Sequence, residues 1–390
     1  MRLTLAHSPK VPPLHPDQTA SMLRKQVTDP LKARFVGRAE VIDLIALAIV
    51  AGEHLFLYGP PGTAKSAVIR AFAQAVDGRY FEYLLTRFSE PNEVFGPIDL
   101  IKLREGLVAT VTDGMLPEAE FAFLDELFNA NSAILNNLLT VLNERLFRRG
   151  RETLRLPLLS LFSASNHLPE DDALGALFDR FLLRCKVDAL PRESMPRLLE
   201  AGWALEHHVA ATMNEVRLTA EDLRRLSIRV MDVDLDDVRE QYAEMVFRVR
   251  DLGVGFSDRR AVKALKLVAA SAVLSGRAAA NASDLWVFRH VWDREEQIAP
   301  LHSLVLGALR ENPADKPHVQ AVVPERVDPE ALAKELAELG GRAAPNASLA
   351  ELARLREQLN RLHDRLVWVT DEAARQHLAG EIMAVRKRIG

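Results

Sequence analysis

The sequence predicts an α/β fold with a five-stranded parallel sheet, followed by segments that are all-helical. Between about residues 35 and 187, short apolar runs alternate with longer segments of helical periodicity, the pattern of strands joined by crossover helices. The runs are apolar almost throughout, as in parallel sheets that helices cover on both faces. The expected strands are residues 54–58, 80–85, 121–125, 158–165 and 181–187.

Three domains are expected along the 390 residues. Strand-like runs stop after residue 187, and only helical periodicity follows Pro191. Leucines recur at three- and four-residue spacing over residues 349–366, and a second apolar series covers residues 378–389, so two antiparallel helices are the simplest account. The expected domains are an α/β core at residues 1–190, an all-helical lid at 191–300 and a C-terminal helical domain (hairpin or triple helix) at 301–390.

Composition excludes several classes of protein. The net charge of -4 and pI near 6.3 give no overall attraction to nucleic acid or to an anionic membrane. Cys185 is the single cysteine, so an intrachain disulfide is impossible. The longest apolar stretch, residues 41–50, contains Asp43 and is too short to span a bilayer. We expect a cytoplasmic protein without membrane insertion.

The strongest motif is the segment GPPGTAKS, which follows the first expected strand and precedes a helical segment. Backbone N–H groups of such a turn, together with the positive end of the helix, bind phosphate. Lys65 is expected to reach the β and γ phosphates of ATP, and the Ser66 hydroxyl to bind Mg²⁺. Ala64 replaces the usual last glycine and still leaves room for close backbone approach. The expected nucleotide-binding residues are Gly59, Pro60, Pro61, Gly62, Thr63, Ala64, Lys65 and Ser66.

Polar side chains follow two further expected strands. Asp125 and Glu126 end the third, at the edge where ligands bind in open α/β sheets. Asp125 is expected to bind the nucleotide's Mg²⁺ with Ser66, and Glu126 to activate the attacking water. A helix N-cap is the ordinary alternative for such a pair. Asn166 ends the next strand and is expected to hydrogen-bond the γ-phosphate or the water; a turn residue before Pro169 is the alternative.

Two arginines are candidates for stabilising the transferring phosphoryl group. Arg180 immediately precedes the last expected strand, and Arg259 begins a lid helix in the segment SDRR. A guanidinium supplied by a neighbouring subunit stabilises the charge on the phosphoryl oxygens. Surface arginines are common, so neither residue carries the assignment alone, and Arg260 beside Arg259 is an alternative.

A basic hairpin is expected at residues 146–156, with its turn at Gly150 and Arg151. Its arginines suit a phosphate backbone. Glu152 lies among them, however, and apart from Phe147 no aromatic residue alternates with them, so ion pairing between subunits is the simpler account.

The phosphate loop, the Asp-Glu strand end, the strand-end asparagine and the two later arginines resemble AAA+ ATPases in their order. Finer motifs over about residues 20–300 resemble the MoxR family and, within it, the RavA branch. These motifs are TRFSEPNEVFGP at 86–97, GMLPEAE at 114–120, LTVLNER at 139–145 and ASN at 164–166. The resemblance implies hexameric rings, a helix-2 insert near residues 97–112 and a hairpin before the sensor strand. It also implies that Asn166 is sensor 1, Arg180 an arginine finger acting in trans and Arg259 sensor 2.

The resemblance implies a homo-hexameric ATPase that remodels or assembles protein clients and has a partner with a von Willebrand factor A domain. RavA-type proteins carry a β-rich module that binds lysine decarboxylase, but residues 312–330 are too short to hold it. The alternative function is a nucleic-acid translocase that uses the hairpin at 146–156. A third is a nucleotide-switched scaffold, against which the presence of Glu126 and Arg180 argues.

Overall fold

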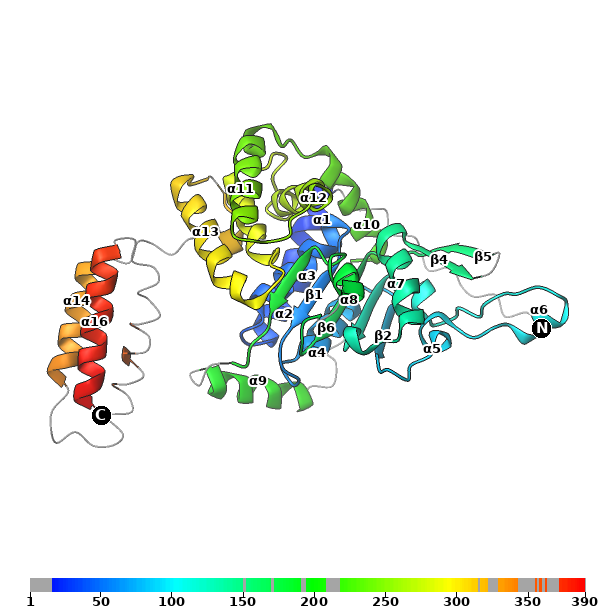
Figure 1. Cartoon of the computed structure of the whole chain (residues 1–390), viewed down its shortest axis with the longest axis horizontal. Coiled ribbons are helices and arrows are strands. Elements are labelled where there is room, and N and C mark those ends of the chain that lie inside the picture. The colour runs from blue at the N-terminus through cyan, green and yellow to red at the C-terminus, as the bar shows by residue number, and fades with distance from the viewer. Residues whose placement is uncertain are drawn as a thin grey trace. The chain divides into compact units, whose positions relative to one another are not determined.

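Figure 1 shows a computed structural model of the chain, which forms two compact units, Met1–Ala321 and Val322–Gly390. The structure describes residues 16–149, 152–169, 172–190, 194–207, 218–314, 316–321, 329–342, 355, 358, 359, 362 and 372–389.

A five-stranded parallel sheet forms the centre of the first unit. Its strand order is β2–β3–β6–β1–β7, and every neighbouring pair runs parallel. The expectation of an α/β fold with five parallel strands is therefore confirmed, with bounds close to those expected. The strands are β1 (Leu55–Tyr58), β2 (Tyr80–Leu84), β3 (Phe121–Asp125), β6 (Ser160–Ser165) and β7 (Leu183–Lys186).

Helices and helical turns precede and connect these strands, and α3 (Ala39–Ala51), directly before β1, is deeply buried. Residues 41–51 of α3 are all buried because the helix packs against β1 and β7 as well as α10 and α12. The others in this part of the chain are α1 (Pro16–Met22), η1 (Leu23–Thr28), α2 (Asp29–Arg34), α4 (Lys65–Ala75), α5 (Pro91–Phe95), α6 (Leu100–Arg104), η2 (Leu116–Glu118), η3 (Leu127–Asn129), α7 (Ser132–Glu144) and α8 (Asp172–Phe178).

An insert and a hairpin extend from the same side of the sheet (Figure 1). The insert carries α6 and is closed by an antiparallel bridge between Ile98 and Thr110. The hairpin pairs β4 (Leu146–Arg149) with β5 (Glu152–Arg155), as expected. The rings of Phe95 and Phe147 stack with centroids 4.9 Å apart, so the two projections contact each other near their bases. The insert exposes Leu100, Ile101, Leu103, Leu107, Val108 and Val111.

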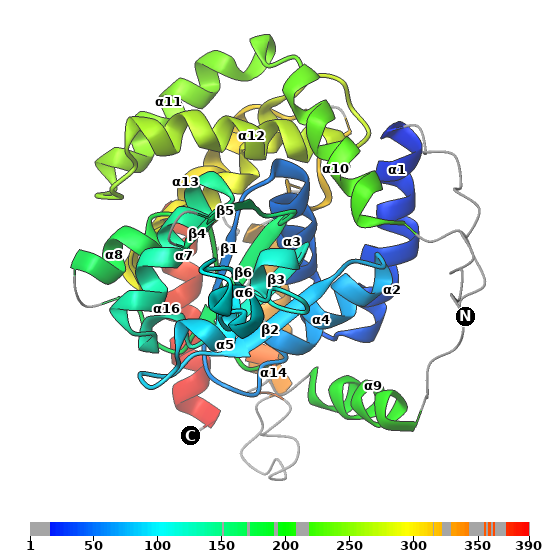
Figure 2. The same ribbon diagram turned by 90° about the vertical axis from the view of Figure 1, so that its right-hand side faces the viewer.

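Among the described residues after β7 in the first unit, the regular elements are helices, and the one β-type contact is an isolated bridge between Asp234 and Ala279. Both views place α9 apart from α10–α12 (Figures 1 and 2). α13 crosses residue 300 and packs against η7, and the domain boundaries expected at 190 and 300 stay predictions. The elements are α9 (Met195–His207), α10 (Ala220–Arg229), η5 (Val230–Asp232), η6 (Asp236–Val238), α11 (Arg239–Asp251), α12 (Asp258–Leu274), η7 (Ala282–His290), η8 (Glu295–Gln297), α13 (Ile298–Glu311) and η9 (Val319–Ala321).

Three buried histidines in the first unit are held neutral. Burial lowers the pKa of His54 well below 6.5, and Arg145 beside it adds to the shift. Burial, reinforced by Arg289, lowers the pKa of His290 to about 3. Burial also lowers the pKa of His318, whose ring stacks on Trp286, to about 3.

We expect the protein to lose stability steeply as the pH falls below 6.5. In the unfolded chain these histidines take up protons below about pH 6.5, whereas the folded chain holds them neutral, so their contribution is complete above that pH and declines below it. Each contributes a slope of about 1.4 kcal/mol per pH unit. Urea unfolding between pH 7 and 5 measures the slope. His318→Phe keeps a ring against Trp286 and should give a shallower dependence, and a slope equal to wild type would contradict this account.

The second unit contains α14 (Pro329–Arg342) and α16 (Glu372–Ile389), which pack against each other. The described members of the leucine series at 349–366 are buried, and residues 349, 352 and 366 lie outside the described residues. α14 was not among the expected helices. The buried cluster comprises Leu332, Leu336, Leu339, Leu355, Leu359, Leu362, Leu378, Ile382 and Val385. Within the described residues, no helix is both long and apolar enough to cross a membrane.

Candidate nucleotide-binding site

The phosphate loop joins β1 to α4, as expected. Gly59 has φ +152°, and a Cβ there would lie 2.2 Å from the Val187 carbonyl oxygen, so only glycine fits. The Lys65 Nζ donates to the carbonyl oxygens of Gly59 (2.8 Å) and Pro60 (2.7 Å). Burial lowers the pKa of Lys65, although Asp125 and Glu126 raise it. The partly desolvated ammonium group therefore lies across the loop and faces the two carboxylates.

Ala64 caps α4 in the left-handed conformation, with φ 64° and ψ 21°. The usual glycine at this position allows close backbone approach, and the positive φ shows that it also suits the left-handed backbone angle. An L-residue in this region costs about 1 kcal/mol more than glycine. The departure from the usual motif therefore places strain directly beside Lys65.

Ala64→Gly should leave stability unchanged or raise it by up to about 0.5 kcal/mol, because relief of the left-handed strain offsets the greater entropy of unfolded glycine. Ala67→Gly, in the first turn of α4, is the matched control and should lose about 0.5–1 kcal/mol. Urea unfolding of both variants measures the difference. Equal losses in the two variants would show that Ala64 is unstrained.

Arg38 supports the loop from behind and was missed by sequence reasoning. It is 8% exposed, and its guanidinium donates to the carbonyl oxygens of Thr63 (2.9 Å) and Asp188 (3.0 Å). It thereby joins the phosphate loop to the segment after β7. The only signal in the sequence was an arginine directly after the glycine that precedes α3.

The two expected carboxylates lie at the carboxyl end of β3. Asp125 accepts a hydrogen bond from the Glu126 backbone N–H (3.0 Å), and burial raises its pKa. Glu126 is the N-cap residue of η3 by position, as the alternative expected, but its backbone is left-handed (φ 53°, ψ 47°) and its side chain makes no cap hydrogen bond, so capping does not account for the carboxylate. Its buried Oε2 has no hydrogen-bond partner among the described residues. Strain and an unpartnered carboxylate oxygen together are typical of a functional site.

Asn166 directly follows β6, the strand between β1 and β3. Because Gly59 donates its backbone N–H to the Ser165 carbonyl oxygen (3.1 Å), Asn166 lies between the phosphate loop and Asp125. Its side-chain oxygen lies 2.8 Å from the Nδ1 of His167, a neighbour that sequence reasoning did not single out. This edge of the sheet thus gathers Lys65, Ser66, Asp125, Glu126 and Asn166.

The two arginine candidates meet at one carboxylate. The Asp179 Oδ2 lies 3.4 Å from the Arg180 Nη1 and 3.3 Å from the Arg259 Nη2. Neither guanidinium forms a hydrogen bond or ion pair with the phosphate loop within the part of the chain that the structure describes. Arg260 is 2% exposed and donates to Asp293 (2.8 Å), so of the two neighbouring arginines Arg259 is the one exposed to a ligand.

Asp293 anchors a second buried arginine, Arg184, which lies in the middle of β7. Arg184 also donates to the Phe178 carbonyl oxygen (3.0 Å) and lies over the Phe178 ring at 3.8 Å. Burial and the like charge of Arg260 lower the pKa of Arg184 to about 9. The Arg184–Asp293–Arg260 cluster therefore ties the sheet to α12. The sequence signal for Arg184 was an arginine between two apolar residues of an expected strand.

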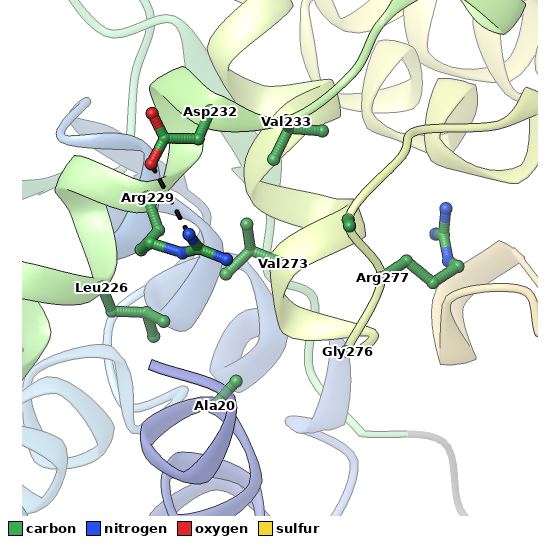
Figure 3. A pocket seen from close by; sticks show the side chains of 9 residues that line it. Ala20, Leu226, Arg229, Asp232, Val233, Val273, Gly276 and Arg277 are labelled. Carbon is green, nitrogen blue, oxygen red and sulfur yellow. Dashed lines mark ion pairs between the residues drawn. The ribbon is translucent and has the colours of Figure 1, made fainter. Parts of the chain in front are cut away.

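Two cavities lie away from this site. A cavity of about 180 Å³ lies between α1, α10 and α12, where Arg229 pairs with Asp232 (3.7 Å; Figure 3). It is smaller than the sites that hold nucleotide-sized ligands. A cleft of about 800 Å³ includes Gly52, Glu120 and Leu159, which precede β1, β3 and β6, and so lies at the opposite edge of the sheet. Among the described residues, no group of three or more His, Cys, Asp or Glu side chains is placed to hold a metal ion.

Fold and site together define a P-loop nucleotide-binding protein of the AAA+ class. Residues 21–228 match the MoxR domain of MoxR-vWA-beta-propeller ternary systems, and residues 231–305 match an AAA lid domain. The chain therefore belongs to the MoxR family of AAA+ proteins. The RavA-like branch stays a prediction.

Relatives agree with this assignment. The chain is 38% identical over 276 residues to an uncharacterized protein of Methanocaldococcus jannaschii, covering 70% of this chain and 72% of that one. It is 26% identical over 161 residues to Chaperone MoxR1 of Mycobacterium tuberculosis, covering 40% of this chain and 42% of that one. A crystal structure from Cytophaga hutchinsonii, named as a candidate ATPase, superposes with a TM-score of 0.61 at 19% identity. The superposition covers 76% of this chain and 96% of that one, and it supports the fold assignment.

Proposed function

We propose that the chain hydrolyses ATP in a Mg²⁺-dependent reaction as a homo-hexameric MoxR-type ring and thereby remodels or assembles protein clients. The observation that carries this proposal is the arrangement at the carboxyl edge of the sheet. There a phosphate loop with a partly desolvated Lys65 faces Asp125 and a strained, unpartnered Glu126. This set of groups suits phosphoryl transfer to water.

The residues present fit ATP and Mg²⁺. In the proposal, Gly59–Ser66 bind the phosphates, with Lys65 on the β and γ oxygens. The oxygen donors Ser66 and Asp125 hold Mg²⁺, which neutralises charge on the phosphate oxygens. Glu126 orients the attacking water and accepts its proton, for which its unpartnered oxygen is available. Asn166 hydrogen-bonds the γ-phosphate or the water.

Arg180 and Arg259 complete the site from two sides. Arg180 acts in trans on the nucleotide of the neighbouring subunit, consistent with its lack of ion pairs to its own phosphate loop within the described residues. Arg259, at the start of α12, senses the nucleotide of its own subunit. The exposure of Arg259 and the burial of Arg260 support this choice.

The family description supports a partner with a von Willebrand factor A domain, and the name of the mycobacterial relative supports a chaperone-like role. The insert has six exposed apolar side chains and is the surface that contacts a client, so that a rearrangement of the ring is transmitted to the client. We propose a cytoplasmic location for the protein. We also propose three domains, which are the core (1–190), the lid (191–300) and the C-terminal helical domain (301–390).

The test is Mg²⁺-dependent ATP hydrolysis measured as a function of protein concentration. Specific activity should rise as subunits assemble, because each site needs its neighbour. Activity that stays constant on dilution to verified monomers would contradict a shared active site. Absence of hydrolysis at concentrations where hexamers form would instead favour the nucleotide-switched scaffold.

The basic hairpin gives weak support to the translocase alternative. The Arg148 Nη2 lies 2.7 Å from Glu144, and Arg149 donates to the Gly96 carbonyl oxygen (2.8 Å), so both arginines already have partners within the chain. Hydrolysis that DNA stimulates in a salt-sensitive manner would favour the translocase. A rate that does not respond to added DNA is the expected result.

A further inference from the structure

Among the described residues, Asp179 is the carboxylate that the two arginines assigned to the reaction share. Its Oδ2 contacts Arg180 at 3.4 Å and Arg259 at 3.3 Å, and its Oδ1 lies 3.7 Å from the Arg260 Nε. A single negative charge thus faces three guanidinium groups. One carboxylate cannot satisfy three cations fully, so at least one of these pairs is easily exchanged.

The three arginines differ in how firmly they are held. Arg260 is 2% exposed and is fixed by Asp293 and by the Val291 carbonyl oxygen (2.8 Å). The Arg259 side chain is 49% exposed, and Asp179 is the ion-pair partner that the structure shows for it among the described residues. Arg180 is 20% exposed, and its buried Nε has no hydrogen-bond partner among the same residues. Arg259 and Arg180 are therefore the two members that can exchange partners.

We propose that Asp179 is a positioning residue that makes Arg180 responsive to the nucleotide of its own subunit. Asp179 is shared between Arg259 and Arg180 in the structure. A bound triphosphate carries more negative charge than one carboxylate and draws Arg259 away from it. Asp179 then pairs with Arg180 and holds that guanidinium toward the neighbouring subunit. This inference rests on the proposed function, because it requires Arg180 to act in trans and Arg259 to bind nucleotide.

The consequence is that the rate of hydrolysis depends cooperatively on ATP concentration, because ATP bound to one subunit positions Arg180 for catalysis in the next. We expect the wild-type rate to depend sigmoidally on ATP. In Asp179→Asn the link is lost, and the Hill coefficient should fall to about 1 while ATP binding persists. A purely structural role would lower stability or rate without removing the sigmoidal shape. Asp258→Asn is the matched control, because Asp258 lies beside Arg259 but pairs with Arg250 (2.7 Å), and it should remain sigmoidal.

Arg259→Gln and the double variant Asp179→Asn/Arg259→Gln complete the experiment. Arg259→Gln should also be hyperbolic, and the double variant should show no further change in the Hill coefficient, because both substitutions remove the same link. If Asp179→Asn does not fold, the test rests on the rate of Arg259→Gln as a function of ATP concentration. A hyperbolic dependence supports the link, and a sigmoidal dependence overturns it.

A hyperbolic wild type, or an Asp179→Asn variant as sigmoidal as wild type, also overturns the link. Arg180→Ala, measured in parallel, separates this failure from failure of the proposed function. If Arg180→Ala stays active, the shared active site itself is wrong. If Arg180→Ala is inactive and Asp179→Asn is sigmoidal, only the role of Asp179 is wrong.

Discussion

Glu126→Gln is expected to lower the rate of ATP hydrolysis by about 10²–10³-fold while ATP binding is kept, because an amide accepts no proton from the attacking water. The carboxylate is held by a left-handed backbone and has a buried oxygen without a hydrogen-bond partner among the described residues. The amide fills nearly the same space, so folding and nucleotide affinity should change little. Single-turnover hydrolysis and equilibrium binding of ATP separate the two effects.

The matched control is Glu120→Gln, at the opposite end of the same strand. Glu120 directly precedes β3 and lies 3.8 Å from the Arg79 Nε, far from the phosphate loop along the strand direction. It should hydrolyse ATP at close to the wild-type rate. If Glu126→Gln retained a rate similar to that of Glu120→Gln, Glu126 would not be the general base, and the strain at this position would need another explanation.

The sheet and its catalytic edge could be predicted because their signals are local. Each apolar strand is contiguous in sequence, and parallel strands place their carboxyl ends at one edge. Residues after β1, β3 and β6 therefore had to converge, and Lys65, Asp125 and Asn166 do lie at that edge. The chemical roles of these residues stay predictions, because geometry shows where a side chain lies and not what it does during turnover.

The features that could not be predicted from the sequence depend on partners far away in the chain, on backbone angles or on burial. Arg38 contacts a carbonyl oxygen 150 residues away, and Arg184 contacts Asp293, which is 109 residues away. No spacing rule connects such pairs. The left-handed angle of Ala64 is likewise invisible in a motif that tolerates alanine. The choice between Arg259 and Arg260 required the solvent exposure of each side chain, which only the structure gives, because the two residues are adjacent and chemically identical.

Arg180→Ala is expected to lower ATP hydrolysis by about 10³-fold without preventing ATP binding, because a guanidinium stabilises the transition state more than the ground state. If Arg180 acts in trans, a substituted subunit still has a complete site when its neighbour supplies Arg180. If Arg180 acts in cis, the substitution disables the subunit's own site whatever its neighbour is. Arg225→Ala removes an exposed arginine that pairs with Glu221 (3.4 Å) and is the matched control, expected to behave as wild type.

Mixing two inactive variants tests the shared site directly. Arg180→Ala subunits keep Glu126, and Glu126→Gln subunits keep Arg180, so an interface between one of each, in the right order, has a complete site. With random assembly from equal amounts, roughly a quarter of interfaces are complete, and activity should recover toward that fraction of wild type. Recovery should vanish when subunits are mixed below the concentration at which they assemble. If both variants are inactive alone and stay inactive in mixed hexamers, Arg180 serves its own subunit, and coupling around the ring must arise from another contact.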